Sequence, residues 1–282
     1  MPELPEVESV ARMVRVALTG PLASPVSAVE LLDQKLLDRS TSMEALYSLA
    51  GTCFGAVSRS GKYLIIRMDG REVPLYLILH LRMTGRIMIV SAGGEPARHT
   101  RLRIVLRNGA ALLFDDPRRF GQLWVTHAPH DVVGTLGPDA LTVSLETFSG
   151  VLSRVNRQLK PLLLDQRVIA GIGNIYADEI LFRARLHPLA VSGSLAADDV
   201  SRLHGAVVSI LAEAVQAGGA NIDGVFKAGE FPVMVYGRSG QPCYACGLPV
   251  SKIRVAQRGT HICSGCQKLA SDHSGTESAA HS

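Results

Sequence analysis

The chain has 282 residues, 47% of them hydrophobic and 19% charged, with a formal net charge of +4. This composition supports sizeable buried cores and two domains with a small additional module. Apolar runs such as Leu75 to Leu79 are far shorter than the ~20 residues that cross a bilayer. The N-terminus, Met1-Pro2-Glu3, is acidic, which is the wrong sign for a secretory signal. We therefore expect an intracellular protein.

The first half of the sequence predicts one helix followed by many strands. Apolar residues recur at helical spacing, and Gly20 is placed to end the helix; they are Val7, Val10, Ala11, Val14 and Leu18. Short apolar or alternating stretches follow at residues 63–68, 73–79, 86–90, 102–106, 111–114 and 123–126. Asn108-Gly109 is a strong hairpin signal. The pattern favours antiparallel sheets packed as a sandwich or barrel.

The second half changes to a helical pattern between Leu141 and about Ala217. Its clearest helix has Val200, Leu203, Val207, Leu211 and Ala214 on one face and is followed by Gly218-Gly219. Leu136-Gly137-Pro138 is the expected linker between the halves. The polar, serine-rich tail after Ala270 is expected to be disordered.

Four of the five cysteines form two pairs near the C-terminus, with the spacing Cys243-x2-Cys246-x16-Cys263-x2-Cys266. This spacing is typical of four thiolates that hold one structural Zn²⁺ ion. Two disulfides are the alternative, which the missing secretory signal disfavours. Residues 236–268 contain five Lys or Arg and no acidic residue. A metal-stabilised module of this charge indicates a contact surface for phosphates.

The N-terminus offers a second chemical site. Removal of Met1 leaves Pro2 as a free secondary amine, and an α-amino group titrates roughly 2.5 pH units below a lysine. Such an amine condenses with a sugar aldehyde carbon to give a cationic iminium, with Glu3 and Glu6 beside it as acid–base groups. The structural alternative is ordinary, because proline and acidic residues are both favoured in a first helical turn.

Three further motifs carry groups suited to nucleic acid. The glycine-rich segment 170–174 ends in Asn174 at a predicted helix start, where backbone N–H groups attract phosphate. Arginines and an aromatic side chain are predicted to lie together on a loop, in the motif Asp116-Pro117-Arg118-Arg119-Phe120-Gly121. Side chains of these types can enter a base stack. Lys62 follows Gly61 and is a candidate phosphate contact. Tight turns, a surface loop and a solvated lysine are the structural alternatives. Between His80 and Arg107 there are six arginines against Glu95 alone, which fits an electrostatic groove or a solvated sheet face.

Together these segments resemble the formamidopyrimidine-DNA glycosylase and endonuclease VIII family of base-excision repair enzymes. The resemblance covers nearly the whole chain in the same order. It rests on Pro2 to Glu8, Gly61 to Leu64, His80 to Gly85, Asp116 to Gly121, Lys160 to Gln166, Gly171 to Glu179, Val235 to Arg238 and the cysteine pairs. Pro2-Glu3-Leu4-Pro5-Glu6 and the Asp116 to Gly121 motif resemble the branch that acts on oxidised purines.

The resemblance implies an α+β multi-domain fold: an N-terminal β-sandwich with flanking helices, a helix–two-turn–helix domain and a C-terminal β-hairpin zinc finger. The expected boundaries are 1–134 for the catalytic domain, 135–141 for the linker, 142–234 for the helical DNA-binding domain, 235–270 for the zinc finger and 271–282 for the tail. The implied partner is duplex DNA that contains damaged bases. The implied protein is a monomer, cytoplasmic or associated with the nucleoid, with one structural zinc ion.

The resemblance also implies a bifunctional glycosylase and AP lyase that removes 8-oxoguanine and formamidopyrimidines and cuts the strand by β,δ-elimination. Pro2 would attack C1′, Glu3 would move protons, and Glu6 would support the site. Lys62 and Arg258 would complete the catalytic set by holding the DNA backbone at the lesion. The implied DNA contacts are Lys160, Asn174, Met83, Arg118 and Phe120, of which the last three fill the gap left by the extruded nucleotide.

Three departures from the family pattern concern lesion choice. Arg82 stands where the family usually has glycine. Asp223 stands where it usually has lysine, and residues 224–234 are shorter than the usual loop over the extruded base. A preference for oxidised pyrimidines or hydantoins is therefore one alternative. A non-catalytic lesion binder is another, and a zinc-ribbon interaction module on an unrelated enzyme is a third.

Overall fold

The structure is a computed structural model that describes residues 2–92, 94–221 and 229–269. It divides into two compact units. The N-terminal unit comprises Met1–Thr135 with Val215–Glu230, and the C-terminal unit comprises Leu136–Ala214 with Phe231–Ser282. The expected domain boundaries stay predictions. Residues Val215–Glu230 belong to the N-terminal unit, although they fall within the helical domain expected at 142–234.

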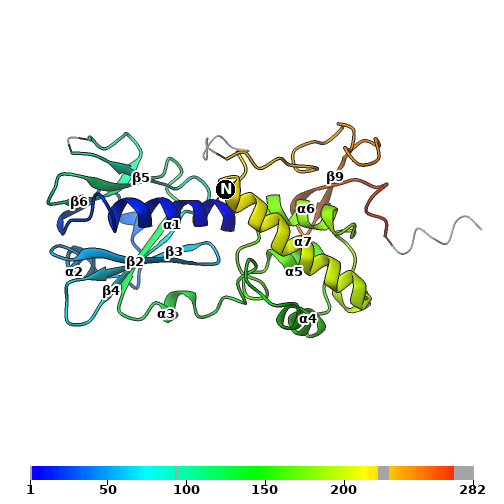
Figure 1. Ribbon diagram of the computed structural model, residues 1–282, viewed down its shortest axis with the longest axis horizontal. Helices are drawn as coiled ribbons and strands as arrows, with labels where there is room; N and C mark the ends of the chain where they lie inside the picture. The colour runs from blue at the N-terminus through cyan, green and yellow to red at the C-terminus, as the bar shows by residue number, and fades with distance from the viewer. Residues whose placement is uncertain (1, 93, 222–228, 270–282) are drawn as a thin grey trace, which may run out of the picture. The chain divides into compact units, whose positions relative to one another are not determined.

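The N-terminal unit contains two four-stranded antiparallel sheets (Figure 1). The first has the order β1-β6-β7-β5, with β1 (Val26–Leu31), β5 (Arg86–Val90), β6 (Thr100–Leu106) and β7 (Ala111–Asp115). The second has the order β2-β3-β4-β8, with β2 (Cys53–Ser60), β3 (Tyr63–Asp69), β4 (Leu75–His80) and β8 (Gln122–Thr126). Short helices accompany them: η1 (Gln34–Leu36), α2 (Met43–Tyr47) and α3 (His130–Val133).

Helix α1 (Leu4–Leu18) supplies one side of the sandwich core. Its apolar face is fully buried and packs with residues of both sheets in one cluster. The helix also runs antiparallel to β2, since Arg15 donates to the Val57 carbonyl at 2.7 Å and Glu8 pairs with Arg59 at 3.2 Å. The N-terminal end of α1 therefore lies toward the turn between β2 and β3.

Two connections cross from one sheet to the other at the same end of the sandwich. The turn Leu81–Gly85 joins β4 to β5, and the loop Asp116–Gly121 joins β7 to β8. These connections are neighbours because β4 pairs with β8 and β5 pairs with β7. Tyr63, His80 and Gln122 are aligned across the second sheet, so the β2–β3 turn lies at this end as well.

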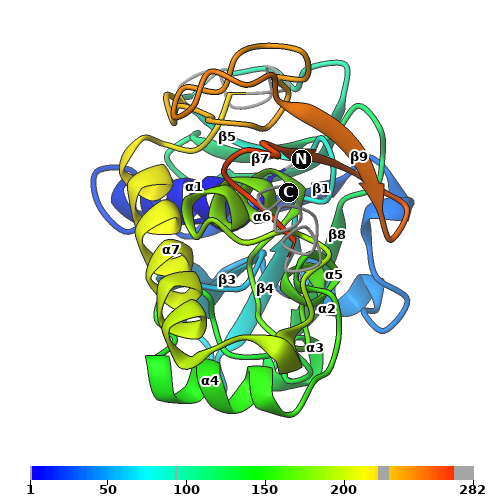
Figure 2. The ribbon, with the colours of Figure 1, turned by 90° about the vertical axis from the view of Figure 1, so that its right-hand side faces the viewer.

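The C-terminal unit combines helices with a β-hairpin (Figure 2). Its elements are α4 (Leu145–Ser153), α5 (Leu159–Leu164), α6 (Asn174–Arg183), η2 (Ser192–Ser194), α7 (Ala197–Gln216), β9 (Ser251–Val255) and β10 (Arg258–Ile262). Helix α7 packs on α4, where the rings of His204 and Phe148 lie 5.5 Å apart and His204 hydrogen-bonds the Val143 carbonyl at 2.8 Å. No helix among the described residues combines the length and apolar character needed to span a bilayer.

The predicted α+β fold is confirmed, with its sandwich, helical region and C-terminal hairpin. The sequence pattern missed β1 and β2. Each of these strands contains a register shift, at Val26/Ala28 and Phe54/Val57, which interrupts the period-two alternation that identifies a strand. The predicted tail at 271–282 and Asp223 lie outside the described residues, as does part of the 224–234 segment.

Candidate active site

The N-terminal residues form a rigid entry to α1. Glu3 is the N-cap, and its backbone N–H donates to Glu6 Oε2 at 2.8 Å. The Glu3 carboxylate in return accepts the Glu6 backbone N–H, which completes a capping box. Both carboxylates are buried, with 1% and 2% of their surface exposed. Pro2 is thereby held directly beside two enclosed acidic groups.

Glu6 also holds a segment from the other end of the sequence. Its Oε1 accepts the backbone N–H of Ala220 at 2.9 Å. Gly219 has φ +95°, and a Cβ at this position would lie 2.5 Å from Glu6 Oε1. Glycine is required at 219 both for the backbone conformation and for this close approach. The Glu6 carboxylate thus connects the segment that bears Pro2 to residues 219–220.

Lys62 occupies the turn between β2 and β3 and is 8% exposed. Arg59 braces this turn, since its guanidinium donates to the Gly61 carbonyl at 2.7 Å and pairs with Glu8 of α1 at 3.2 Å. The Glu8–Arg59 pair links the helix to the turn. Pro2 and Lys62 are therefore attached to elements that are fastened to each other.

The two sheet-crossing connections carry the side chains predicted to enter the base stack. Met83 is 37% exposed in the Leu81–Gly85 turn, and Phe120 is 50% exposed in the Asp116–Gly121 loop. The Arg118 guanidinium lies over the Phe120 ring, 4.9 Å from its centroid, in a cation–π contact. Large apolar groups at a surface, accompanied by an arginine, suit insertion between bases.

Asp116 joins these two connections. Its buried carboxylate accepts the backbone N–H groups of Arg118, Phe120 and Gly121 at 3.2, 2.8 and 2.7 Å. It also accepts the Thr84 hydroxyl, from the neighbouring turn, at 2.5 Å. One carboxylate therefore fixes the conformation of the Arg118–Phe120 loop and ties it to the Met83 turn.

Arg119 does not take part in the group of side chains predicted to enter the base stack. Its guanidinium forms a bidentate pair with Asp33, at 2.5 and 2.9 Å, and its backbone has φ 61°. Hydrogen bonding to Arg119 holds the pKa of the Asp33 carboxyl below its ordinary value, against the opposing effect of burial. Of the two adjacent arginines in the motif, Arg119 anchors the loop and Arg118 lies over Phe120.

His80 ends β4 beside the Leu81–Gly85 turn. Its Nδ1 accepts the backbone N–H of Arg82 at 3.0 Å, and its ring meets Tyr63 edge-on at 4.6 Å. Burial, followed by the charges of Arg82 and Lys62, lowers the pKa of His80 to about 3. The neutral ring fixes the turn and adds no charge of its own.

The C-terminal unit holds the remaining predicted contacts. Asn174 is the first residue of α6, and its Nδ2 donates to the Gly259 carbonyl at 3.3 Å. Its Oδ1 is buried and has no hydrogen-bond partner among the described residues. Arg258 is exposed at the start of β10, after a two-residue turn in which Ala256 and Gln257 have φ values of 44° and 64°. Asn174 and the strand that begins with Arg258 are adjacent.

Lys160 has a different environment from the one its predicted DNA contact requires. Its side chain and that of Asp178 are both fully buried and pair at 2.6 Å. The ammonium also donates to the Gly259 carbonyl at 2.9 Å and to Thr260 Oγ1 at 2.8 Å. Asp178 further accepts the His261 backbone N–H at 2.8 Å. Lys160 thus fastens β10 to α5 and α6, with its donors directed inward.

The four paired cysteines lie together in the C-terminal hairpin module. Their Sγ atoms all lie within 4.8 Å of one another, with Cys243 and Cys266 at 4.0 Å and Cys246 and Cys263 at 3.3 Å. Tetrahedral Zn–S bonds of about 2.3 Å separate sulfurs by about 3.8 Å. Burial and the neighbouring thiols raise the pKa of Cys266 to about 12. A cation is needed for all four to be thiolates, and the donor set fits one structural zinc ion.

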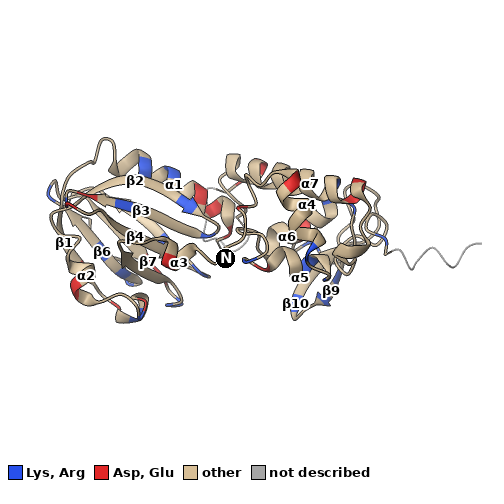
Figure 3. Ribbon diagram, turned by 90° about the horizontal axis from the view of Figure 1, so that it is seen from below, with Lys and Arg blue, Asp and Glu red and all other residues tan. Residues whose placement is uncertain are grey.

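Several of the basic residues that suggested an electrostatic groove are paired with acidic residues in the structure. Three arginines of the 80–107 stretch are neutralised within the sandwich: Arg86 pairs with Asp115, Arg103 with Glu30, and Arg101 approaches Asp33. Figure 3 shows the acidic residues of α1 at its N-terminal end and the basic residues further along the helix, whereas β9 and β10 carry basic residues. The positive charge is thus concentrated in local clusters.

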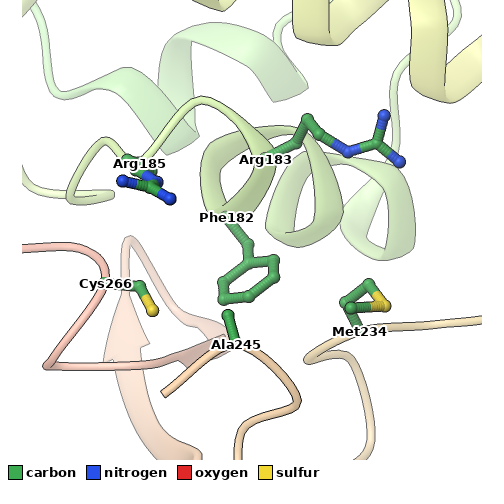
Figure 4. Close-up of a pocket in the computed structure, with 6 residues that line it drawn as sticks. All are labelled: Phe182, Arg183, Arg185, Met234, Ala245 and Cys266. Carbon is green, nitrogen blue, oxygen red and sulfur yellow. The ribbon is translucent and has the colours of Figure 1, made fainter.

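A pocket of about 210 Å³ opens between α6 and the zinc module (Figure 4). It is lined by Phe182, Arg183, Arg185, Met234, Ala245 and Cys266. Arg183 is committed to Glu213 through two hydrogen bonds of 3.0 Å. None of the predicted catalytic residues lines this pocket, so it is separate from the candidate active site.

Comparisons with known proteins follow the same three parts of the chain. Residues 1–123 match the formamidopyrimidine-DNA glycosylase N-terminal domain, residues 136–224 match the H2TH domain of that enzyme, and residues 240–269 match the zinc finger found in FPG and IleRS. A formamidopyrimidine-DNA glycosylase from Herpetosiphon aurantiacus is 40% identical over 278 residues, which is 95% of this chain and 100% of the relative.

The chain belongs to the formamidopyrimidine-DNA glycosylase family. A relative of the same name from Enterococcus faecalis is 36% identical and is covered over 98% of its length. The crystal structure of the Lactococcus lactis family member with Fapy-dG-containing DNA superposes with a TM-score of 0.84 at 32% identity, and it covers 95% of this chain and 100% of the other. These matches confirm the resemblance to the family and the zinc finger.

Sequence reasoning gave no role to Thr84, Asp116 or His80, although all three lie in motifs that it singled out. The signal for Asp116 was its position just before a proline–arginine turn, where an aspartate accepts backbone N–H groups two residues on. Thr84 gave no comparable signal, because its partner Asp116 belongs to another loop. The partner of His80 is the backbone N–H of Arg82, only two residues on, but a histidine at the end of a strand is not a typical turn residue.

Proposed function

We propose that this protein excises oxidised purines from duplex DNA and then cleaves the strand at the resulting abasic site. The observation that carries the proposal is the buried Glu3–Glu6 capping box, which holds Pro2 at the entrance of α1 beside the Lys62 turn. Family membership supports the same reaction. The substrate would bring the protein to the nucleoid or the surrounding cytoplasm.

The chemistry begins with Pro2 as nucleophile once Met1 has been removed. Its secondary amine attacks C1′ of the damaged nucleotide, and the bond to the base breaks as the electrons leave with the base. The ring bond between C1′ and O4′ then breaks as O4′ takes up a proton, which opens the sugar and leaves C1′ as an iminium. The iminium withdraws electrons from C2′, so loss of a C2′ proton expels the 3′ phosphate. A second elimination expels the 5′ phosphate and leaves a one-nucleotide gap.

Glu3 is the acid–base group for these transfers, because its carboxylate lies directly beside Pro2 in an enclosed setting. Glu6 supports the site by holding the Glu3 backbone and the 219–220 segment together. Lys62 neutralises a phosphate at the lesion. The close association of α1 with the β2–β3 turn through Glu8 and Arg59 supports this division of roles.

The base must leave the helix before Pro2 can reach C1′. Met83, Arg118 and Phe120 would occupy the vacated space, and their exposure on two adjoining loops supports that role. Asn174 and Arg258 would hold the DNA backbone. We assign Lys160 to positioning: its buried bonds to the Gly259–Thr260 segment hold β10, and therefore Arg258, in place.

Borohydride trapping tests the proposal. Untagged protein is incubated with duplexes that contain 8-oxoguanine opposite cytosine, an oxidised pyrimidine or an abasic site, and covalent adducts are resolved by denaturing gel. We expect an adduct with 8-oxoguanine that is mostly lost in Pro2→Gly. The matched control is the same chain with one extra residue before Pro2, which keeps every side chain and blocks only the amine. Intact mass establishes whether Met1 is absent.

The pattern across substrates distinguishes the alternatives. Trapping only with the oxidised pyrimidine would move the specificity to that lesion class. Trapping only at the abasic site would leave a lyase without base recognition. An absence of any adduct with the amine demonstrably free, together with retained lesion binding, would make the protein a non-catalytic binder and overturn the proposal.

A further inference from the structure

Arg82 occupies a backbone conformation that favours glycine. Its φ is 54°, and the only other non-glycine residues with positive φ in the described chain are Arg119, Arg185, Ala256 and Gln257. A side chain at such a position is strained, because its Cβ approaches the following carbonyl oxygen. An arginine therefore stands at a place where glycine would fit without strain.

Hydrogen bonds define the position of Arg82 closely. Its backbone N–H donates to His80 Nδ1 at 3.0 Å, and its guanidinium donates to Gln122 Oε1. Leu81 and Gly85 close the turn through a backbone bond of 2.9 Å. The backbone and the guanidinium of Arg82 are therefore both held by hydrogen bonds. The side chain is nevertheless exposed, which leaves other N–H groups of the guanidinium facing solvent.

The partner of Arg82 differs from those of the other arginines at this end of the sandwich. Arg86 and Arg119 each pair with a carboxylate, Asp115 and Asp33 respectively, and Arg118 lies over the Phe120 ring. Among the described residues, the Arg82 guanidinium pairs with no carboxylate, and its partner is the neutral Gln122 amide. Lys62 adds a second positive charge nearby, and the charges of both residues act on His80. The Arg82 charge is thus oriented without being neutralised.

We propose that Arg82 is an additional DNA-backbone contact, in which the guanidinium, oriented by Gln122, binds a phosphate next to the point where Met83 enters the base stack. This inference rests on the proposed function. Met83 is the next residue, so a phosphate held by Arg82 would fix the duplex relative to the inserted side chain.

A phosphate fits this group better than a base edge does. A guanidinium presents parallel N–H groups that match two phosphate oxygens, and several remain after the bond to Gln122. Phosphate contacts also fix the register of a protein on DNA without reading its sequence. The contact should therefore strengthen binding to all lesions alike.

Arg82→Gly tests the inference, and Arg185→Gly is its matched control. Arg185 is also exposed with φ 56°, so the control makes the same chemical change and relieves the same kind of backbone strain elsewhere. Dissociation constants are measured across a series of salt concentrations on duplexes with an abasic-site analogue and on duplexes with 8-oxoguanine. We expect Arg82→Gly to weaken binding about tenfold. The slope of log K against log [salt] should become shallower by about 0.9.

Additional variants separate contact from folding. Both glycine variants should have melting temperatures equal to or above that of the parent. Gln122→Ala should give a smaller loss of affinity with an unchanged salt slope, because the charge remains while its orientation is lost. Parent-like affinity and slope for Arg82→Gly would overturn the inference, and so would a loss confined to one lesion. Failure of the parent to bind lesion DNA would instead count against the proposed function.

Discussion

Single side chains in this protein combine a structural bond with a place in the site, and His80 is the clearest case. Its Nδ1 fixes the turn that carries Arg82 and Met83, and this role requires the neutral ring. The depressed pKa of about 3 keeps the ring neutral throughout the physiological range. Stability falls in acid, because His80 takes up a proton in the unfolded chain but stays neutral in the folded chain.

The pH dependence of stability follows from this difference. An unfolded histidine titrates near 6.5, so stability should be constant above that pH and should fall as the pH drops toward 3. The slope from one such group is about 1.4 kcal/mol per pH unit. Urea unfolding at a series of pH values from 8 to 4 measures this dependence of the free energy of unfolding on pH. His80→Gln should remove this slope between pH 6.5 and 4.5, whereas the exposed His127→Gln should leave it; identical slopes would contradict the assignment.

At the level of elements, the two sheet-crossing connections behave as one unit because Asp116 bonds to both. The same principle operates in the C-terminal unit, where the Lys160–Asp178 pair joins two helices to β10. Breaking a buried ion pair by removing one partner costs about 3–5 kcal/mol, since the remaining charge stays buried. In both places a buried charge fixes exposed residues. Asp116 fixes Arg118 and Phe120, and the Lys160–Asp178 pair fixes the strand that begins with Arg258.

Thr84→Val tests the coupling between the connections. The change keeps the shape of the side chain and removes the hydroxyl that donates to Asp116. We expect a loss of about 1–2 kcal/mol in the free energy of unfolding. Excision from duplex DNA should slow several-fold, with a matching delay in the fluorescence change of 2-aminopurine placed opposite the lesion. Thr84→Ser should restore both rates; a loss of stability with unchanged kinetics would show that the bond is structural alone.

At the level of the whole molecule, the zinc module is the part whose stability depends on an added ion. Its described core is small, with Phe182, Val235 and Val250 packed around the cysteines. Such modules take much of their folding free energy from the metal. The position of this basic hairpin should therefore depend on the bound ion.

Cys243→Ser should release the zinc and weaken DNA binding. Loss of one of four ligands removes the tetrahedral site, and the hairpin that carries Arg258 then loses its fixed position. Zinc content is measured by atomic absorption, and affinity is measured on a lesion duplex. Cys53→Ser is the control, because Cys53 lies in β2 and belongs to no metal-binding cluster in the part of the chain that the structure describes. Normal binding by a zinc-free protein would separate the module from DNA recognition.

Much of this organisation could be predicted from local patterns. The spacing of Val7, Val10 and Val14 specifies α1, and the cysteine spacing specifies the metal site. The environment of Lys160 could not be predicted, because Asp178 and Thr260 lie 18 and 100 residues away along the chain. A lysine in a sequence carries no sign of burial until its partners are known. Strands β1 and β2 were missed for a related reason. Their bulges, which interrupt the alternation of apolar and polar residues, depend on pairing with neighbouring strands.

The contact between Gly219 and Glu6 affects how genetic variation in this protein should be interpreted. A substitution at 219 changes a position more than two hundred residues from Pro2, yet the added carbon meets the Glu6 carboxylate, which braces the segment that bears Pro2, the proposed nucleophile. In a mutational screen, an inactive allele at 219 would be assigned by sequence position to the helical domain expected at residues 142–234. By mechanism it would belong with alleles of residues 2–6, and intragenic suppressors should arise at Glu6.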